Sequence, residues 1–228
     1  MSLRSKFFAL TYDRQMAKAE QGGLHAMRER LLAAASGDVV EIGGGTGLNL
    51  PCYGPEVRTL TITEPGPPML RRLERRVDEQ RPSATVLRAP AEDLPFGDHS
   101  FDVAVSTLVL CGVDDQPRAL RELRRVLRPG GRLLFIEHLR SEDPDLARLQ
   151  DRMNWLNRLV VCCDCNRPTL DSVGQAGFTV TELDHTELPK APKFVRPVVT
   201  GSATAPAAAP SGSARQDQSA DGRIPHTS

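Results

Sequence analysis

The clearest chemical feature of the chain is a glycine-rich turn that follows an apolar run ending in an acid. The run is Val39-Val40-Glu41-Ile42, and the turn is Gly43-Gly44-Gly45-Thr46-Gly47. Such a run predicts a buried parallel strand, and glycines behind a strand let the backbone turn tightly and let a ligand come close. A helix expected to begin near Leu48 would point free N–H groups and its positive dipole end at that ligand.

The spacing of the glycines excludes two common nucleotide sites. It is G-x-G-x-G, and the third glycine of the nicotinamide and flavin pattern would fall at Leu48. A P-loop is excluded as well, because no Gly-Lys-Ser/Thr sequence follows. The turn therefore predicts a ligand site of another kind.

A carboxylate stands where a ribose-binding acid is expected. Residues 59–63 alternate as a β-branched strand and end at Glu64, which lies 21 residues after Gly43. In a βαβ unit, an acid at the tip of the second strand lies beside the ribose and accepts hydrogen bonds from its hydroxyls. Glu64 is therefore predicted to bind a ribose, the alternative being a surface acid before Pro65.

Two further segments follow in order along the chain. Residues 91–96 precede an expected strand at 101–106, and the loop at 127–132 precedes another apolar strand. With the glycine turn and Glu64, this ordered set resembles class I S-adenosylmethionine (SAM)-dependent methyltransferases. The closest similarity is to the branch of ubiquinone/menaquinone C-methyltransferases and methyltransferase-like thiol methyltransferases. The resemblance covers roughly residues 12–200, is specific for the cofactor and says little about the acceptor.

The resemblance implies a fold, a cofactor and a set of binding residues. The fold is a Rossmann-like, doubly wound α/β fold with a seven-stranded, mostly parallel sheet and an antiparallel C-terminal edge hairpin. The cofactor is SAM. Glu41 would help to hold its methionyl ammonium, unless this acid only caps the loop. Gly43, Gly45 and Gly47 would be the cofactor glycines, and Glu64 the ribose clamp.

The resemblance also places residues around the adenine ring. Pro65 and Met69 would flank it, with plain core packing as the alternative for Met69. Ala91 and Glu92 would contact it through a backbone N–H and a carboxylate. Many relatives have Gly-Asp-Ala where this chain has Ala-Pro-Ala at residues 89–91, so the contact to the exocyclic amine would pass to Glu92 or its neighbour.

The acceptor is expected at the carboxyl ends of the fourth and fifth strands, which line the crevice of this fold. Ser106 is a candidate cofactor contact, or else a satisfied strand hydroxyl. His138 is the candidate base or acceptor-positioning group, because an imidazole near pH 7 can take a proton; the alternative is a histidine hydrogen-bonded at a strand end. Tyr12, Trp155 and Cys163 are candidate acceptor-binding residues.

Three cysteines cluster at residues 162–166, in the order Cys-Cys-Asp-Cys-Asn. Their spacing fits no four-ligand zinc pattern, although Asp164 or His185 could complete a site. The favoured interpretation is a turn near the acceptor pocket, since the related thiol methyltransferases also carry a cysteine before an Asn-Arg pair. No metal is expected.

The composition limits partners and location. Lysine plus arginine equals aspartate plus glutamate, 29 against 29, so no global charge attracts nucleic acid or anionic lipid. No export signal and no run of roughly 18 apolar residues is found, and the five cysteines should then stay reduced. We expect a cytoplasmic protein with a small-molecule acceptor, no nucleic-acid partner and no membrane span; the oligomeric state is left open.

The 228 residues suffice for one sizeable α/β domain. Residues 1–36 are expected to form a helical cap with a break at Gly22-Gly23, and residues 37–200 the methyltransferase domain. From residue 201 the composition changes to Ala, Pro, Ser, Gly and Gln, which predicts a disordered tail over 201–228. Helices are expected at 69–77, 116–127, 145–161 and 167–176, and the last strands at 178–183 and 194–199, with Pro197 at an edge or bulge.

Methyl transfer from a sulfonium requires alignment of the nucleophile and exclusion of water. With only His138 as a candidate base, the sequence favours a soft or easily deprotonated acceptor. The expected acceptor is a thiol, amine or quinol/phenol of a small metabolite or natural product. Two alternatives remain: a SAM-binding protein without transferase activity, and a macromolecular methyltransferase. The balanced charge disfavours the latter, as does Ser-Thr-Leu-Val at residues 106–109 in place of Asn/Asp-Pro-Pro-Tyr.

Overall fold

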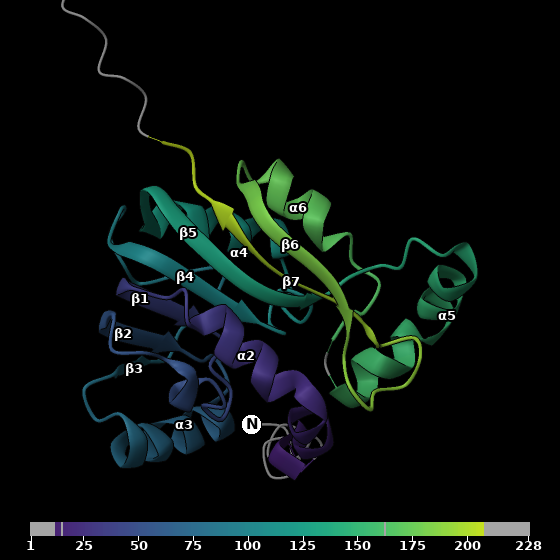
Figure 1. Ribbon diagram of the computed structural model, residues 1–228, viewed down its shortest axis with the longest axis horizontal. Coiled ribbons are helices and arrows are strands. Elements are labelled where there is room, and N and C mark those ends of the chain that lie inside the picture. The colour runs from purple at the N-terminus through teal and green to yellow at the C-terminus, as the bar shows by residue number, and fades with distance from the viewer. Residues whose placement is uncertain (1–11, 15, 162, 208–228) are drawn as a thin grey trace, which may run out of the picture.

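A seven-stranded sheet forms the centre of the protein, with the strand order β3-β2-β1-β4-β5-β7-β6 (Figure 1). The computed structural model describes residues 12–14, 16–161 and 163–207. The first five strands pair in parallel, whereas β7 is antiparallel to both β5 and β6. The expected doubly wound sheet with an antiparallel C-terminal hairpin is confirmed. The strands are β1 Gly37–Ile42, β2 Val57–Thr63, β3 Thr85–Leu87, β4 Phe101–Thr107, β5 Leu127–His138, β6 Thr179–Glu187 and β7 Pro197–Thr204.

Helices cover both faces of this sheet, and Figure 1 shows α2 in front of it and α4 behind it. Because successive side chains of a strand point to opposite faces, Val39 packs in one apolar cluster with Leu73 of α3, whereas Val40 packs in another with Leu120 of α4. The strands therefore need apolar residues on both faces, which explains their continuous apolar runs. The helices are α2 His25–Leu32, α3 Pro67–Gln80, α4 Gln116–Val126, α5 Pro144–Val161 and α6 Thr169–Gln175, with a π-helical turn Glu20–Leu24 and a 3₁₀ turn Leu50–Cys52.

The N-terminal helical segment breaks where the glycines predict it. Gly23 has a φ of 134° inside the π-helical turn that precedes α2. Only a residue without a Cβ adopts this conformation at little cost. The expected helical start before residue 12 lies outside the described residues.

The C-terminal boundary differs from the expectation. The strand predicted at 194–199 is instead β7, Pro197–Thr204, so the tail predicted from residue 201 was placed too early. The small residues Gly201, Ser202 and Ala203 are buried between β5 and β6, and composition alone had grouped them with the low-complexity sequence that follows. Pro197 is not on an edge strand, because β7 pairs on both sides; it is the first residue of the strand, where its missing N–H is tolerated.

No α-helix begins near Leu48, contrary to the expectation. The chain forms only the short 3₁₀ turn Leu50–Cys52 there. Pro51 has no N–H to donate, and Gly47 has a φ of 86°, which is incompatible with a helix. The glycine turn is therefore not followed by the helix dipole that the sequence predicted. The short strand β3 was also not located from the sequence.

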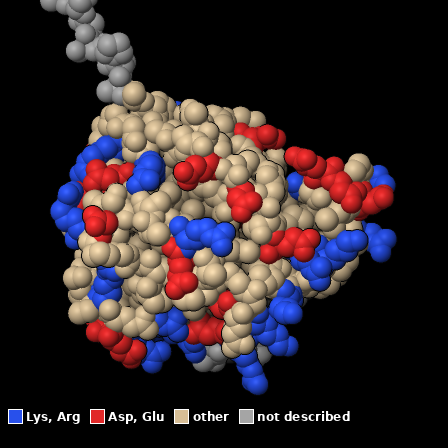
Figure 2. Space-filling model, in the orientation of Figure 1, with Lys and Arg blue, Asp and Glu red and all other residues tan. Residues whose placement is uncertain are grey.

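The surface carries both signs of charge. On the face shown in Figure 2, acidic and basic side chains are interspersed over the sheet and helices. In the part of the chain that the structure describes, no helix combines the length and apolar character needed to cross a bilayer.

We predict that Gly201→Ala destabilises the fold. A Cβ at this position would lie 2.5 Å from the backbone oxygen of Glu182 and 3.0 Å from Phe135 Cζ, and neither can move without disturbing the sheet. Urea denaturation should show a loss of about 1–3 kcal/mol in the free energy of unfolding. Gly54→Ala is the control, because its Cβ would meet nothing within 4 Å. Equal stability of the two variants would contradict the placement of β7.

Candidate active site

The glycine turn lies between the carboxyl ends of β2 and β4. Ile42, the last residue of β1, pairs with Ser106 of β4, and the backbone N–H of Gly44 donates to the oxygen of Thr63 at the end of β2 (2.9 Å). The turn is thus fixed at the edge of the sheet where ligands bind in parallel α/β folds.

The glycines have separate physical roles. Gly43, Gly45 and Gly47 have φ values of 57°, 58° and 86°. A Cβ on Gly43 would lie 2.6 Å from the side chain of Val109, so this glycine permits close packing. A Cβ on Gly45 would meet nothing closer than 3.9 Å. Space is therefore open above Gly45, where a ligand can approach the backbone.

Glu64 is tied to this turn. Its side chain accepts a hydrogen bond from the backbone N–H of Gly45 (2.9 Å) and another from that of Gly66 (2.7 Å). Burial raises the pKa of Glu64, while these two N–H groups counteract the shift. The surface-acid alternative is wrong, because only 7% of the residue is exposed. Ribose binding by Glu64 stays a prediction.

Glu41 lies behind the turn in the wall of a narrow hollow of about 20 Å³. Its carboxylate accepts hydrogen bonds from Asn49 Nδ2 (2.9 Å) and Tyr53 Oη (2.7 Å). Burial raises its pKa. A cation placed beside this acid would favour its charged form, as the predicted ammonium contact requires. The hollow is lined by Tyr12, Arg28, Glu41, Gly43, Gly44, Gly45, Thr46, Leu48, Asn49 and Thr107.

Arg28 in this wall was missed from the sequence. It is 3% exposed and donates to Glu20, Asn49 and Thr107. A signal was present, because Leu24, Arg28 and Leu32 are spaced by four residues and form the buried stripe of the helix. An arginine on the apolar stripe of a helix indicates a buried polar partner or a ligand.

A second, larger cavity of about 400 Å³ lies next to this hollow, and Tyr12 is in the wall of both. The predicted acceptor residues His138 and Cys163 line it. Trp155 does not, because 67% of it is exposed; helix α5 turns Leu156 and Asn157 to the cavity instead. The remaining lining is mostly apolar: Met16, Lys18, Ala19, Leu108, Leu188, Pro189, Lys190, Ala191, Pro192, Phe194 and Val195.

His138 is the histidine in the wall of this cavity. The residue is 5% exposed, and its Nδ1 has no hydrogen-bond partner among the described residues. Burial lowers the pKa of His138 to about 4, although the backbone near Val195 and Pro197 partly offsets the shift. The imidazole is therefore neutral near pH 7 and is a weaker base than a solvent-exposed histidine. Its role as a base stays a prediction.

Ser106 is fully buried, and its hydroxyl donates to Glu137 Oε1 (2.6 Å). The hydrogen bond favours the satisfied-hydroxyl alternative, and a cofactor contact of Ser106 stays a prediction. Glu137, which the sequence did not single out, also accepts from the backbone N–H groups of Val109, Leu110 and Cys111 (3.0, 3.0 and 3.2 Å). It thereby shapes the loop after β4 that packs on Gly43.

The predicted adenine residues lie outside the walls of these two cavities. Pro65 is exposed, while Met69 and Ala91 are buried. The carboxylate of Glu92 accepts from the backbone N–H groups of Asp114 (2.9 Å) and Asp115 (3.2 Å), so it organises the start of α4. The adenine contacts of these four residues stay predictions.

The cysteine-containing turn is built around Asp164. This carboxylate accepts hydrogen bonds from Arg167 (2.6 Å) and Arg158 (3.2 Å). Its backbone N–H donates to the oxygen of Cys111 (2.8 Å), which joins the turn to the loop after β4. Asp164 is thus committed to arginines, and Cys163 is held at the large cavity.

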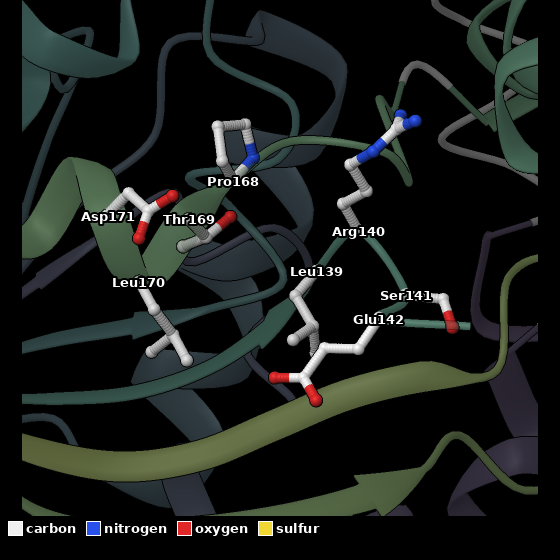
Figure 3. Close-up of a pocket in the computed structure, with 8 residues that line it drawn as sticks. All are labelled: Leu139, Arg140, Ser141, Glu142, Pro168, Thr169, Leu170 and Asp171. Carbon is white, nitrogen blue, oxygen red and sulfur yellow. The ribbon is translucent and has the colours of Figure 1, made fainter. Parts of the chain in front are cut away.

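A third hollow of about 240 Å³ lies beyond the end of β5 (Figure 3). In this view Arg140 points away from the other labelled side chains, and it forms an ion pair with Asp151. Thr169 donates to the backbone oxygen of His138 (3.0 Å). None of the predicted site residues lines this hollow.

Comparisons with known proteins agree with this geometry. Residues 40–135 match the family described as a methyltransferase domain. The chain is 32% identical over 200 residues to the human thiol S-methyltransferase TMT1A, covering 85% of this chain and 81% of that protein. It is 34% identical to the ubiquinone/menaquinone biosynthesis C-methyltransferase UbiE of Ectopseudomonas mendocina, covering 64% of this chain and 61% of UbiE. The fold matches a SAM-dependent methyltransferase from Thermotoga maritima with a TM-score of 0.66 and 24% identity, covering 90% of this chain and all of that one.

The chain therefore belongs to the SAM-dependent methyltransferases. It is an enzyme that uses SAM to methylate small molecules. The open space above Gly45, the buried acid Glu41 and the tethered Glu64 suit such a cofactor.

We predict that His138 makes the fold sensitive to acid. Its folded-state pKa of about 4 lies below the ordinary value of about 6.5, so between these values the unfolded chain binds a proton that the folded chain does not. The free energy of unfolding should fall as pH drops through this window, by roughly 3 kcal/mol over the whole range. His138→Gln should lose this component, whereas the control His185→Gln, at an exposed position, should keep it. Parallel urea titrations at several pH values measure the difference, and identical pH profiles for wild type and His138→Gln would contradict the assignment.

Proposed function

We propose that this methyltransferase acts on the sulfur of an apolar small-molecule thiol. The observation that carries the proposal is the large, mostly apolar cavity that shares Tyr12 with the glycine-turn hollow and has His138 in its wall. Its volume of about 400 Å³ falls in the range of small-ligand sites, and apolar walls with few polar groups are typical of such sites.

The walls favour an apolar acceptor. Leu108, Leu156 and Phe194 are among the side chains that an apolar group would cover, at about 25 cal/mol for each Å² removed from water. A cationic acceptor would lose its hydration there without an anionic partner, because the charged side chains among the described residues of the wall are Lys18 and Lys190. Amines, which are protonated near pH 7, are therefore poorer acceptors than thiols in this cavity.

The chemistry also favours sulfur. SAM supplies a methyl group on a sulfonium. A thiol becomes a good nucleophile once it loses its proton, and its ordinary pKa of about 8.5 lies below the value of about 10 for a phenol. The imidazole of His138 can take that proton only transiently, because burial lowers its pKa to about 4, and solvent is the final proton acceptor. The cavity otherwise excludes water from the reacting atoms. The products are a methyl thioether and S-adenosylhomocysteine.

The similarity to human thiol S-methyltransferase TMT1A over most of both chains supports the same acceptor class. The balance of 29 basic and 29 acidic residues supports free small molecules over nucleic acid as substrates, and a cytoplasmic site of action is part of this proposal.

We expect apolar thiols to be methylated in an assay of thiols, amines, phenols and quinols with SAM. Release of S-adenosylhomocysteine with each acceptor is the measurement. His138→Gln should lower kcat about 100-fold for alkyl thiols and much less for acidic aryl thiols, which ionise without help. The exposed-site variant His185→Gln serves as the control.

The assay separates the alternatives. Turnover of phenols or quinols without thiols would overturn the thiol proposal. Binding of SAM without turnover of any acceptor would indicate a SAM-binding protein that is not a transferase.

We also predict that Glu64→Ala weakens the binding of S-adenosylhomocysteine at least tenfold. The variant removes the predicted ribose acceptor and leaves the N–H groups of Gly45 and Gly66 without their partner. Calorimetry measures the affinity. Glu74→Ala, an exposed acid on α3, is the control, and equal affinities for the two variants would refute the ribose clamp.

A further inference from the structure

The guanidinium of Arg28 is buried in the wall of the narrow hollow, and the described residues supply acceptors for only some of its N–H groups. The residue is 3% exposed, and its one ion-pair partner within the described residues is Glu20, at 3.1 Å from Nε. Burial of a cation is costly unless its hydrogen bonds are satisfied. Because Arg28 lies in the wall of the hollow, a ligand in the hollow could supply the remaining hydrogen-bond acceptors.

The donors of Arg28 can be accounted for one by one. A guanidinium has five N–H donors. Nε uses one on Glu20, and Nη1 uses two, on Asn49 Oδ1 (2.8 Å) and Thr107 Oγ1 (3.0 Å). No acceptor for the two N–H groups of Nη2 is found within residues 12–14, 16–161 and 163–207.

Thr107 supplies a further donor at the same place. Its oxygen accepts from both Arg28 Nη1 (3.0 Å) and Asn49 Nδ2 (2.9 Å). Both lone pairs of the hydroxyl are then occupied, which leaves its hydrogen free to donate. Thr107 also lines the hollow, so two residues offer donors there.

Glu41 provides the opposite charge in the same wall. Asn49 connects the two groups, because its Nδ2 donates to Glu41 Oε1 (2.9 Å) and its Oδ1 accepts from Arg28. An acid and a guanidinium bridged by one amide complement a ligand that carries an ammonium and a carboxylate on adjacent atoms. The methionyl end of SAM is an amino-acid zwitterion of this kind.

We propose that Arg28 and Thr107 bind the α-carboxylate of the methionyl group, opposite the ammonium contact of Glu41. This inference rests on the proposed placement of the cofactor at the glycine turn. Arg28 and Thr107 then select nucleosides that carry the amino-acid group and align the sulfonium with the large cavity. The N-terminal helical segment becomes part of the cofactor site, because Arg28 comes from α2.

Two ligands separate the amino-acid contacts from the nucleoside contacts: S-adenosylhomocysteine, which has the ammonium and the carboxylate, and 5′-methylthioadenosine, which lacks both; the variants at Arg28 and Thr107 then single out the carboxylate. We expect Arg28→Gln to weaken S-adenosylhomocysteine binding at least tenfold in calorimetry and to leave 5′-methylthioadenosine within about twofold. Arg28→Lys should retain part of the affinity, because a lysine keeps the charge without the fork geometry. Arg30→Gln is the matched control on the exposed face of α2 and should bind both ligands like wild type.

A second variant guards against misfolding of Arg28→Gln. Thr107→Val keeps the shape of the side chain and removes the hydroxyl, and we expect it to weaken S-adenosylhomocysteine several-fold and 5′-methylthioadenosine little. If Arg28→Gln and Thr107→Val weakened the binding of both ligands equally, the two residues would have only a structural role and the inference would be overturned. Unchanged binding of both ligands would overturn it as well. If the wild-type protein bound neither ligand, the cofactor site itself would be wrong. If it bound 5′-methylthioadenosine as tightly as S-adenosylhomocysteine, the carboxylate contact and the ammonium contact would both be wrong, while the nucleoside site would stand.

Discussion

The hydrogen bond between the Glu64 carboxylate and the backbone N–H of Gly45 is the contact on which the site depends. It joins the end of β2 to the turn after β1, and the second oxygen of Glu64 holds Gly66 at the start of α3. A buried carboxylate must have such donors, because burial alone penalises its charge. The requirement fixes the glycine turn in one conformation, with open space above Gly45.

The same constraint recurs at the carboxyl ends of two other strands. Glu41, the residue before the last of β1, accepts hydrogen bonds from Asn49 and Tyr53. Glu137, near the end of β5, accepts hydrogen bonds from Ser106 and from three backbone N–H groups. Burial raises the pKa of each acid, and these hydrogen bonds act against the shift. Three acids thus order the loops at this edge of the sheet, and Glu41 is the one that lines the narrow hollow at the glycine turn.

The N-terminal segment closes this edge and joins the two cavities. Asp13 accepts a hydrogen bond from Thr46 in the glycine turn (2.5 Å) and pairs with Arg76 of α3 (3.0 Å). These contacts hold the neighbouring Tyr12 where it lines both the narrow hollow and the large cavity. Burial raises the pKa of Tyr12 to about 12, so its hydroxyl stays protonated near neutral pH. The side chain lies between the expected cofactor site and the expected acceptor cavity.

The sequence by itself predicted the glycine turn and the acid Glu64 at the tip of the following strand, because strand periodicity and glycine spacing are local properties of the chain. Its family resemblance implied the mostly parallel sheet with an antiparallel C-terminal hairpin, whereas the strand order came from the tertiary structure. The sequence also placed His138 correctly, since strand ends meet at one edge. Tertiary structure alone decided the roles of Ser106 and Trp155, which depend on which neighbour each side chain meets. It likewise decided that residues 201–204 form the end of a buried strand, because a composition rich in small residues does not reveal strand pairing. The environment of Arg28 was also decided by the tertiary structure. Its place on the apolar stripe of the helix was visible in the sequence, but its partners Asn49 and Thr107 lie 21 and 79 residues away, and only folding brings them together.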